Sequence, residues 1–285
     1  MTSKADLHTH TNASDGRLTP TQLVDLAAEA GLRILAITDH DSTEGLAEAR
    51  LAAEKHPDLT LVSGIEMSTD IPGSEVHMLG YFLDYENADF QRTLTNLRSA
   101  RRDRGRGMVV KLRDMGMEIP WDRVAELAGE GAVGRPHVAQ VMVEKGYVSS
   151  FQEAFDRYIG RNGPAYVERV KLTPVEAVEM LVRVGALAAL AHPSMLSNLD
   201  ELVEELKVAG LAAMEVHYQD YDRRTRDRLA RVAEGHGLLK VGGSDYHGLG
   251  GPHERMLGDI PLPDEDIEAF LERAGQANLS HGSQN

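Results

Sequence analysis

Nine histidine and acidic residues are placed along the chain as metal ligands would be. Imidazole and carboxylate groups bind zinc, manganese and iron, and most of these residues directly follow apolar runs of strand length. Two pairs are spaced by one residue, which directs both side chains of an extended segment to the same side. Nine ligands exceed what one ion needs and suit two or three divalent ions. The predicted ligands are His8, His10, Asp15, His40, Glu66, His77, His192, Asp245 and His247.

The joint pattern carries this prediction, because any single histidine is more often a buried structural residue. Ser14-Asp15-Gly16 is also an ordinary turn sequence. Glu215 and His217 end another apolar run, where they could orient ligands or belong to the core or the surface. Four other histidines lie on predicted helix ends, loops or the tail and are interpreted as non-ligands: His56, His236, His253 and His281.

The elements that must position these residues alternate between strand and helix. Seven short apolar runs, mostly followed by amphipathic stretches, predict a parallel sheet, and closure into a barrel would bury both of its faces. The C-terminal strand ends of a barrel meet at one face, where active sites are built. The predicted strands are residues 5–8, 33–38, 59–65, 76–83, 186–191, 212–217 and 238–242.

A block of helical patterning interrupts this alternation. Residues 96–166 are predicted to form a helical insertion that caps the metal face of the barrel. The barrel would then consist of residues 1–95 and 167–275. The polar residues 276–285 are predicted to be a disordered tail.

Composition limits the classes of function. Of 285 residues, 30 are Lys or Arg and 45 are Asp or Glu, which gives a formal net charge of −15. This charge argues against a grip on nucleic acid by the whole surface, so phosphate would have to meet local positive charge. The chain has no cysteine, which excludes disulfides, thiolate catalysis and cysteine-based zinc sites.

No targeting or membrane segment is visible in the sequence. The first seven residues lack the apolar core of a signal peptide, and no stretch approaches the ~18 apolar residues that span a bilayer. We therefore expect a cytoplasmic protein with no membrane contact, and we infer no stable protein partner.

One basic cluster stands out in this acidic chain. It could line a path for a nucleotide backbone, or it could be the solvated face of a long helix. Only Asp103 opposes it within the cluster. Its members are Arg98, Arg101, Arg102, Arg104 and Arg106.

Five short motifs resemble those of the PHP (polymerase and histidinol phosphatase) family, in the same order and over residues 6–248. They are His8-Thr9-His10, Thr38-Asp39-His40, Gly64-Ile65-Glu66, Ala191-His192-Pro193 and Ser244-Asp245-Tyr246-His247. The resemblance implies an α/β fold, a distorted seven-stranded (β/α)7 barrel with a metal cluster at the C-terminal strand ends.

The resemblance also implies how the ligands divide among ions. One ion would be held by His8, His10, Glu66 and Asp245. A second would be held by Glu66, as a bridge, with His77 and His192. A third would be held by Asp15, His40 and His247, where some branches of the family have histidine in place of Asp15. Glu66, His192 and Asp245 are the predicted catalytic residues.

Three features are similar to the stand-alone bacterial branch of the family: Glu75–Tyr81 (EVHMLGY), the helical insertion and Gly134-Arg135-Pro136-His137. That branch includes nucleoside 3′,5′-bisphosphate phosphatases and 5′-to-3′ exoribonucleases acting on short RNA. By this resemblance Arg135 and His137 are predicted substrate ligands. Arg135 also precedes Pro136 at a predicted helix N-terminus, which favours an anion but is equally compatible with a solvated helix start.

The predicted activity is hydrolysis of the phosphate ester of a nucleotide by hydroxide that Mn, Fe or Zn ions activate for attack on phosphorus. The substrate would be a small nucleotide phosphate or a short oligonucleotide. A histidinol-phosphatase-like phosphomonoesterase is the alternative within the family. A barrel amidohydrolase and a non-catalytic metal-binding PHP module are the alternatives outside this chemistry.

Overall fold

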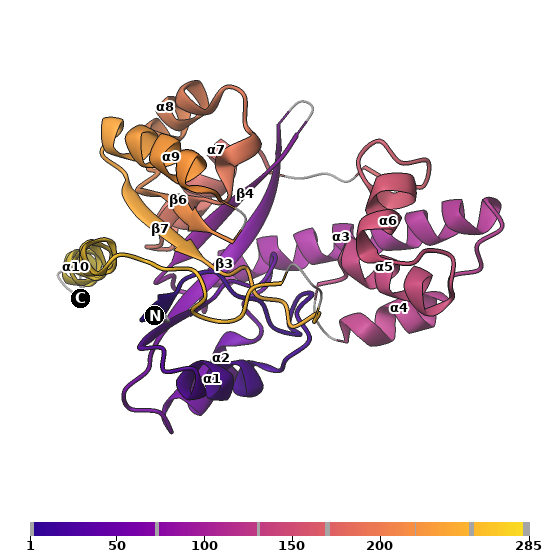
Figure 1. Ribbon diagram of the computed structural model, residues 1–285, viewed down its shortest axis with the longest axis horizontal. Helices are drawn as coiled ribbons and strands as arrows, with labels where there is room; N and C mark the ends of the chain where they lie inside the picture. The colour runs from indigo at the N-terminus through magenta and orange to yellow at the C-terminus, as the bar shows by residue number, and fades with distance from the viewer. Residues whose placement is uncertain are drawn as a thin grey trace.

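The computed structural model describes residues 3–71, 74–129, 132–168, 172–219, 221–250 and 254–281, with side chains up to residue 273. Seven strands form one sheet in chain order, and helices surround it (Figure 1). The strands are β1 (Ala5–Asp6), β2 (Ile34–Ile37), β3 (Thr60–Ile71), β4 (Ser74–Tyr81), β5 (Leu187–Leu190), β6 (Ala213–Tyr218) and β7 (Leu239–Gly243).

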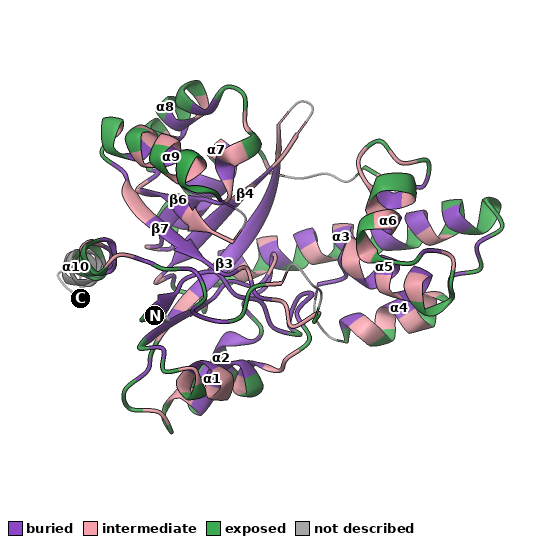
Figure 2. Ribbon diagram, in the orientation of Figure 1, coloured by how far each residue is buried: buried purple, intermediate pink, exposed green. Residues whose placement is uncertain are grey.

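The sheet curls until its first and last strands meet. Just after β1, the amide of Leu7 donates to the carbonyl of Gly242 at 3.2 Å, and the amide of Asp245 donates to the carbonyl of His8 at 2.9 Å. Strands β2 and β5 are buried along their whole length (Figure 2). The predicted distorted seven-stranded barrel is confirmed.

Strand β4 departs from the expected parallel arrangement. It runs antiparallel to both β3 and β5, whereas the other neighbouring pairs are parallel. Only two residues separate β3 from β4, and a link that short can join antiparallel strands alone. The start of β4 therefore lies at the C-terminal ends of its neighbours, and this brings His77 to the predicted ligand face.

Strand β3 is also longer than the sequence predicts. It continues to Ile71 instead of ending near Ile65, because its second half pairs with β4 in a hairpin that extends beyond the barrel. Glu66 consequently lies inside the strand instead of following it.

The helices cover the barrel and form a separate lobe on one side of it (Figure 1). The helices Pro20–Glu29 and Pro174–Arg183 each begin at a Thr-Pro pair, and Thr19 and Thr173 close capping boxes at their N-termini. The helical elements are α1 (Pro20–Glu29), α2 (Leu46–Ala53), α3 (Ala88–Asp114), α4 (Trp121–Ala128), α5 (Arg135–Glu144), α6 (Phe151–Ala154), η1 (Phe155–Ile159), α7 (Pro174–Arg183), η2 (Pro193–Met195), α8 (Leu199–Ala209), α9 (Arg223–Gly235) and α10 (Asp264–His281).

Helix α3 belongs to both lobes. Phe90 and Leu94 near its start pack into the barrel cluster, whereas Met108 and Leu112 near its end pack with α4, α5 and α6 in a separate hydrophobic cluster. The predicted boundary at residue 96 falls inside this continuous helix, which connects the insertion to the barrel.

The C-terminal helix α10 closes the far side of the barrel from the insertion (Figure 1). Phe270 is fully buried, and its ring lies 5.1 Å from that of Tyr81 and 5.0 Å from that of Phe82. The helix continues to His281, and the disorder expected for residues 276–285 stays a prediction. Ala277 and Leu279 are good helix formers, and the last four residues lie outside the described part of the chain.

Among the described residues, no helix combines the length and the apolar character that crossing a membrane requires.

Candidate metal centre

All nine predicted ligands converge at the end of the barrel that faces the insertion. His40 follows β2 and forms a β-bridge with Glu66. His192 follows β5, and Asp245 and His247 follow β7, as predicted. His8 and His10 follow β1, and Asp15 comes from the loop between β1 and α1.

Glu66 lies at the centre of the cluster. Its side chain is 1% exposed, and its two oxygens face different sets of imidazoles. The Oε1 atom lies 2.7 Å from His77 Nδ1 and 3.1 Å from His192 Nε2. The Oε2 atom lies 3.1 to 3.3 Å from nitrogens of His8, His10 and His40. A carboxylate placed in this way can be shared between two ions.

Two further carboxylates complete the cluster. Asp245 Oδ1 lies 3.0 Å from His10 Nε2 and 3.3 Å from His8 Nε2. Asp15 lies 3.4 Å from His247 Nε2 through Oδ1 and 3.9 Å from His40 Nε2 through Oδ2.

Among the described residues, three groups of side chains could each hold an ion, because the ligand atoms within each group all lie within 4.8 Å of one another. One is the set expected for the first ion, and another is the set expected for the third ion with His10 added. The remaining group joins Glu66 and His77 to His40, whereas His192 was expected in that place. His192 stays close to this group, since its ring lies 5.1 Å from that of His77.

The donor atoms fit metal ions. Both ring nitrogens of His10, Asp15 Oδ1 and His40 Nδ1 are buried and make no hydrogen bond, although oppositely polarised atoms lie 3 to 4 Å away. Buried polar atoms without hydrogen bonds are costly, and an ion between them would satisfy them. Nitrogen and oxygen donors without thiolate suit zinc, manganese and iron.

The electrostatics of the cluster without metal favour the ligand form of His40 and of the three carboxylates. The carboxylates outweigh burial and raise the pKa of four other histidines, which are His8, His10, His192 and His247. Burial lowers the pKa of His40 to about 3, which leaves its ring neutral. Burial raises the pKa of Asp245, but the imidazoles of His8 and His247 outweigh it and hold this pKa well below its usual range. Neutral imidazole and ionised carboxylate are the forms that bind metals.

Strand β6 supplies groups that orient the ligands. Glu215 is fully buried, and its Oε1 lies 3.0 Å from His8 Nδ1 while its Oε2 accepts the amide of His192 at 2.7 Å. Tyr218 Oη donates to Asp245 Oδ2 at 2.6 Å. Of the two β6 residues considered from the sequence, Glu215 reaches the site, and His217 instead pairs with Asp266 of α10 at 2.8 Å. Nothing in the sequence had drawn attention to Tyr218.

Buried aspartates hold the backbone that carries the ligands. Asp39 accepts hydrogen bonds from Thr11 and from the hydroxyl of Ser14, and so ties the loop before Asp15 to the end of β2. Asp6 accepts the amide of Ser244 at 2.9 Å, which joins β1 to the segment carrying Asp245.

A small pocket of 90 Å³, the arginine pocket, borders the metal cluster. His40, His77 and Asp15 contribute one side of it, and the insertion contributes Pro136 and Phe155. This shared lining confirms that the insertion caps the metal face. The cations of the arginine pocket are Arg101, Arg104 and Arg135.

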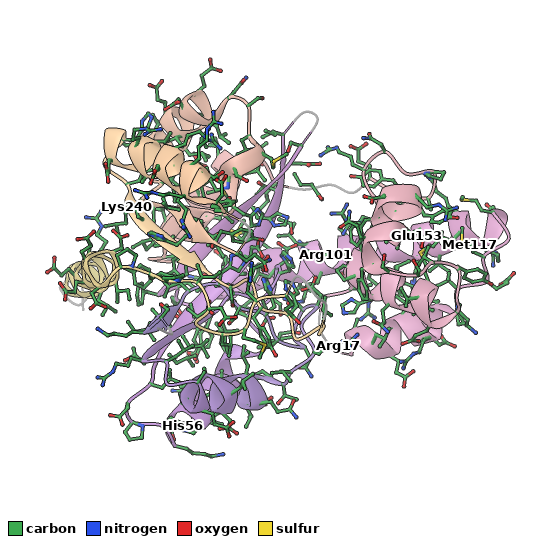
Figure 3. All side chains as sticks on the ribbon, viewed as in Figure 1. Arg17, His56, Arg101, Met117, Glu153 and Lys240 are labelled. Atoms are coloured by element: carbon green, nitrogen blue, oxygen red, sulfur yellow. The ribbon has the colours of Figure 1, made fainter. Side chains whose placement is uncertain are left out.

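The basic cluster of α3 divides between two environments. Arg101 and Arg104 are each 5% exposed and face the arginine pocket, whereas Arg102 is exposed. Figure 3 shows Arg101 between the barrel and the insertion lobe. Arg106 lies over the ring of Trp121, and Arg98 pairs with Glu44 at 2.9 Å. The solvated-face alternative therefore holds for Arg102, and the nucleotide path stays a prediction for Arg101 and Arg104.

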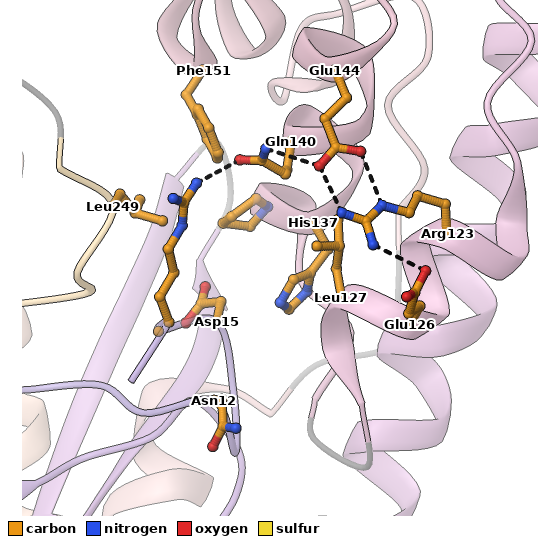
Figure 4. Close-up of a pocket in the computed structure, with 13 residues that line it drawn as sticks. Asn12, Asp15, Arg123, Glu126, Leu127, His137, Gln140, Glu144, Phe151 and Leu249 are labelled. Carbon is orange, nitrogen blue, oxygen red and sulfur yellow. Dashed lines mark hydrogen bonds and ion pairs between the residues drawn. The ribbon is translucent and has the colours of Figure 1, made fainter. Parts of the chain in front are cut away.

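A larger cavity of 480 Å³ adjoins the arginine pocket, and Asp15 and Pro136 line both spaces. Figure 4 shows Asp15 and His137 in it, together with Phe151 and Gln140. His137 is 7% exposed, and its Nδ1 accepts the amide of Gly134 at 2.9 Å. The structure thus places both predicted substrate ligands beside the metal cluster, Arg135 in the arginine pocket and His137 in the larger cavity.

The remaining histidines with described side chains lie away from the cluster. His56 pairs with Asp25 at 2.7 Å and His236 with Asp200 at 3.1 Å. His253 lies outside the described residues, and the side chain of His281 is not described.

Comparison with known proteins gives a consistent result. Residues 6–161 match the family model described as the PHP domain. A 5′-3′ exoribonuclease of Haemophilus influenzae is 34% identical over 87% of this chain and 91% of its own length. A 3′,5′-nucleoside bisphosphate phosphatase of Chromobacterium violaceum is 31% identical over 90% of this chain and 92% of its own length. A phosphoribosyl 1,2-cyclic phosphate 1,2-diphosphodiesterase of Eggerthella lenta is 32% identical, over 87% and 96% respectively.

Solved structures share the whole fold. A protein of Bifidobacterium adolescentis, described as a predicted metal-dependent phosphoesterase, has a TM-score of 0.86 at 32% identity and covers 95% of this chain and 96% of its own. A Chromobacterium violaceum protein is described as an amidohydrolase with bound sulfate and no metal. It has a TM-score of 0.87 at 29% identity, and the match covers 95% of this chain and 97% of that protein's chain.

A closed seven-stranded barrel with ligand clusters at one end, together with relatives that cleave phosphate esters, defines a metal-dependent phosphoesterase. The chain belongs to the PHP family. Its reaction is that of a phosphoric ester hydrolase.

Proposed function

We propose that this protein hydrolyses the phosphate ester of a nucleotide with two or three divalent ions of manganese, iron or zinc. One observation carries the proposal: three arginines converge in a 90 Å³ pocket that His40 and His77 of the metal centre also line. A pocket of this size and charge suits a phosphate group, whereas the amide bond that an amidohydrolase cleaves is itself neutral and gives the arginines no anion to bind. The amidohydrolase alternative lacks this support.

The chain's own residues would hold the substrate and shape the site. The nine predicted ligands would hold the ions, with Glu66, His192 and Asp245 as the catalytic set. Bound divalent ions would supply an acidified water and neutralise charge on the phosphoryl oxygens. Arg104 and Arg135 would donate charge-assisted hydrogen bonds to the remaining oxygens.

The larger cavity supports a nucleotide as the substrate. Sites for small organic ligands usually measure ~300–1,000 Å³, and the 480 Å³ cavity meets the arginine pocket at Asp15 and Pro136. A phosphate in the small pocket can therefore extend a nucleoside, or the next residue of a short oligonucleotide, into the large one. The names of two relatives, a nucleoside bisphosphate phosphatase and an exoribonuclease, support the same class. We further propose a cytoplasmic location and no stable protein partner.

The test combines metal analysis with a substrate panel. Protein purified without chelators is analysed for metal, and phosphate release is measured from a nucleoside 3′,5′-bisphosphate and from histidinol phosphate. The same protein is tested on 5′-phosphorylated short RNA and on a set of amides. We expect bound metal and preferential cleavage of the nucleotide or the RNA. Preference for histidinol phosphate or for amides would support the corresponding alternative.

Glu66→Ala is the informative variant, because this carboxylate faces five imidazoles at once. We expect it to lose metal and activity together, whereas the exposed Glu54→Ala serves as the matched control and retains both. Full phosphoesterase activity in a metal-free Glu66→Ala protein would refute the scheme.

A further inference from the structure

The arginine pocket contains a carboxylate of the chain itself. Glu75 lies on β4 two residues before His77, so both side chains point to the same face of the strand. Glu75 lines the pocket and forms an ion pair with Arg135, and its Oε1 lies 4.0 Å from Arg104 Nη1. The segment Glu75–Tyr81 was singled out in the sequence, but the metal centre accounts for only His77 in it.

The third arginine of the pocket has a separate counter-charge. Arg101 Nε donates to Asp41 Oδ2 at 2.6 Å, and its Nη2 donates to the hydroxyl of Ser68. Asp41 is fully buried and also accepts the amide of Ser68. Arg101 is therefore anchored to the barrel, whereas Arg104 and Arg135 face Glu75.

The position of Glu75 in the hairpin cannot be explained by strand pairing. Its direct cross-strand partner is Asp70, and like charges opposite each other destabilise a hairpin. Asp70 is paired with Arg161 at 2.9 and 3.1 Å, and neither of these two residues lines the pocket. The arginines, instead of the hairpin, explain why Glu75 is tolerated.

We propose that Glu75 is a displaceable internal anion, which occupies Arg104 and Arg135 until the phosphoryl group of a substrate takes its place. Arginine binds carboxylate and phosphate through the same donor geometry, so one can replace the other on these guanidinium groups. The side chain of Glu75 is 22% exposed, which gives it a path toward solvent. This inference rests on the proposed function, because it requires the arginine pocket to receive phosphate.

The exchange has a consequence for turnover. A carboxylate that competes with phosphate weakens phosphate binding, and it covers the two arginines again when inorganic phosphate leaves. Glu75 thereby limits inhibition by the phosphate product. Removing the charge of Glu75 would take away the carboxylate that Arg104 and Arg135 share in the ligand-free protein.

Glu75→Gln tests the proposal, with Asp70→Asn as the matched control from the opposite strand of the same hairpin. Binding of inorganic phosphate to the purified metal-containing protein is measured by calorimetry, and thermal unfolding is recorded with and without phosphate. The metal content of every protein is measured, and differences at equal metal content report on the arginine pocket. We expect Glu75→Gln to bind phosphate about tenfold more tightly, because the competing charge-assisted hydrogen bonds to the arginines are lost.

The other readouts follow from the same exchange. Without phosphate, Glu75→Gln should melt at a lower temperature than the wild type, and phosphate should raise its Tm more than it raises that of the wild type. Asp70→Asn should change phosphate affinity by less than about twofold. If Glu75→Gln does not fold, Glu75→Asp, which withdraws the charge by one methylene, should show tighter phosphate binding in the same direction.

Two outcomes would overturn the proposal, and they differ in what else they overturn. Equal or weaker phosphate binding in the Glu75 variants, with Arg135→Gln still weakening it, would refute the exchange and leave the arginine pocket as a phosphate site. Phosphate binding that neither the Glu75 variants nor Arg135→Gln alter would refute the exchange and the phosphate site of the proposed function together.

Discussion

At the scale of single residues, the metal centre combines buried charge with unusual backbone geometry. His192 and Asp245 adopt positive φ angles of 28° and 53°, and Asp41, next to His40, adopts 50°. Such conformations cost about 1–3 kcal/mol for residues other than glycine. They lie at or beside ligand positions, where the surrounding hydrogen bonds hold them. The strain at these three residues therefore coincides with the chemistry, whereas Phe82, with a φ of 60°, lies against Phe270 of α10.

The first prediction concerns Glu215, which orients two ligands. Glu215→Gln should lower metal affinity about 10- to 100-fold, the usual effect of losing a hydrogen-bond partner behind a metal ligand. The reason is that its carboxylate contacts His8 Nδ1 and the amide of His192. Competition with a chromogenic chelator measures the affinity. The exposed Glu204→Gln serves as the control, and an unchanged affinity in Glu215→Gln would contradict an orienting role.

The second prediction concerns pH and His137. Burial lowers the pKa of His137, so the unfolded chain, with a pKa near ~6.5, takes up a proton at higher pH than the folded protein. As pH falls below ~6.5, the unfolded state gains the proton first, and the free energy of unfolding decreases by at most about 1.4 kcal/mol per pH unit until the lower folded pKa is reached.

His137→Gln removes this titration while keeping a side chain that can cap the start of α5. Its free energy of unfolding should therefore fall less steeply than that of the wild type between about pH 6.5 and pH 5. Urea unfolding at several pH values measures both slopes. Parallel curves for the two proteins would show that His137 does not titrate differently in the folded and unfolded states.

At the scale of elements, the direction of β4 and the length of α3 shape the site. The reversal of β4 brings both His77 and Glu75 to the end of the barrel where the other strands finish. Helix α3 begins against the barrel and ends in the insertion, so Arg101 and Arg104 near its middle lie between the two lobes. These two elements build the arginine pocket together with α5.

The third prediction compares two arginines of α3. Arg104→Gln should raise KM for a nucleotide phosphate at least about tenfold, because a charge-assisted hydrogen bond contributes ~1.5–3 kcal/mol. Arg102 is exposed, so Arg102→Gln should leave both KM and Tm unchanged. Steady-state kinetics with thermal unfolding separates loss of binding from loss of folding. A larger effect at Arg102 than at Arg104 would contradict the pocket assignment.

At the scale of the whole molecule, the metal centre joins segments that are far apart in the chain. Its ligands come from residue 8 to residue 247 and from both edges where the barrel closes. The ligand-bearing arrangement exists only in the folded chain, so metal binding and folding are thermodynamically linked. The site therefore stabilises the barrel that builds it.

The fourth prediction follows from this linkage. Removing the metal with a chelator should lower Tm, because a ligand present at a thousandfold excess over its Kd stabilises the folded state by ~4 kcal/mol. Adding Mn, Fe or Zn back should restore it, and thermal unfolding measures both steps. Glu66→Ala should not respond to either treatment. A wild-type Tm that is insensitive to chelator and metal would argue against a bound metal cluster.

The sequence alone predicted the barrel and the nine residues that converge at its end, because both depend on local features. A ligand such as His192 directly follows its strand, and in a barrel strand ends meet at one face whatever the details. Helix starts at Thr19 and Thr173 were equally local, since capping involves only a few neighbouring residues.

Tertiary structure alone decided the contacts that depend on packing between distant segments. No local pattern encodes how distant elements are oriented relative to one another. This orientation reverses β4 and excludes Arg102 from the pocket that buries Arg104. It also brings Tyr218 to Asp245 and Glu75 to Arg135. Residue type can state which side chains are able to bind metal or phosphate. Only the folded barrel and its insertion determine which of them meet.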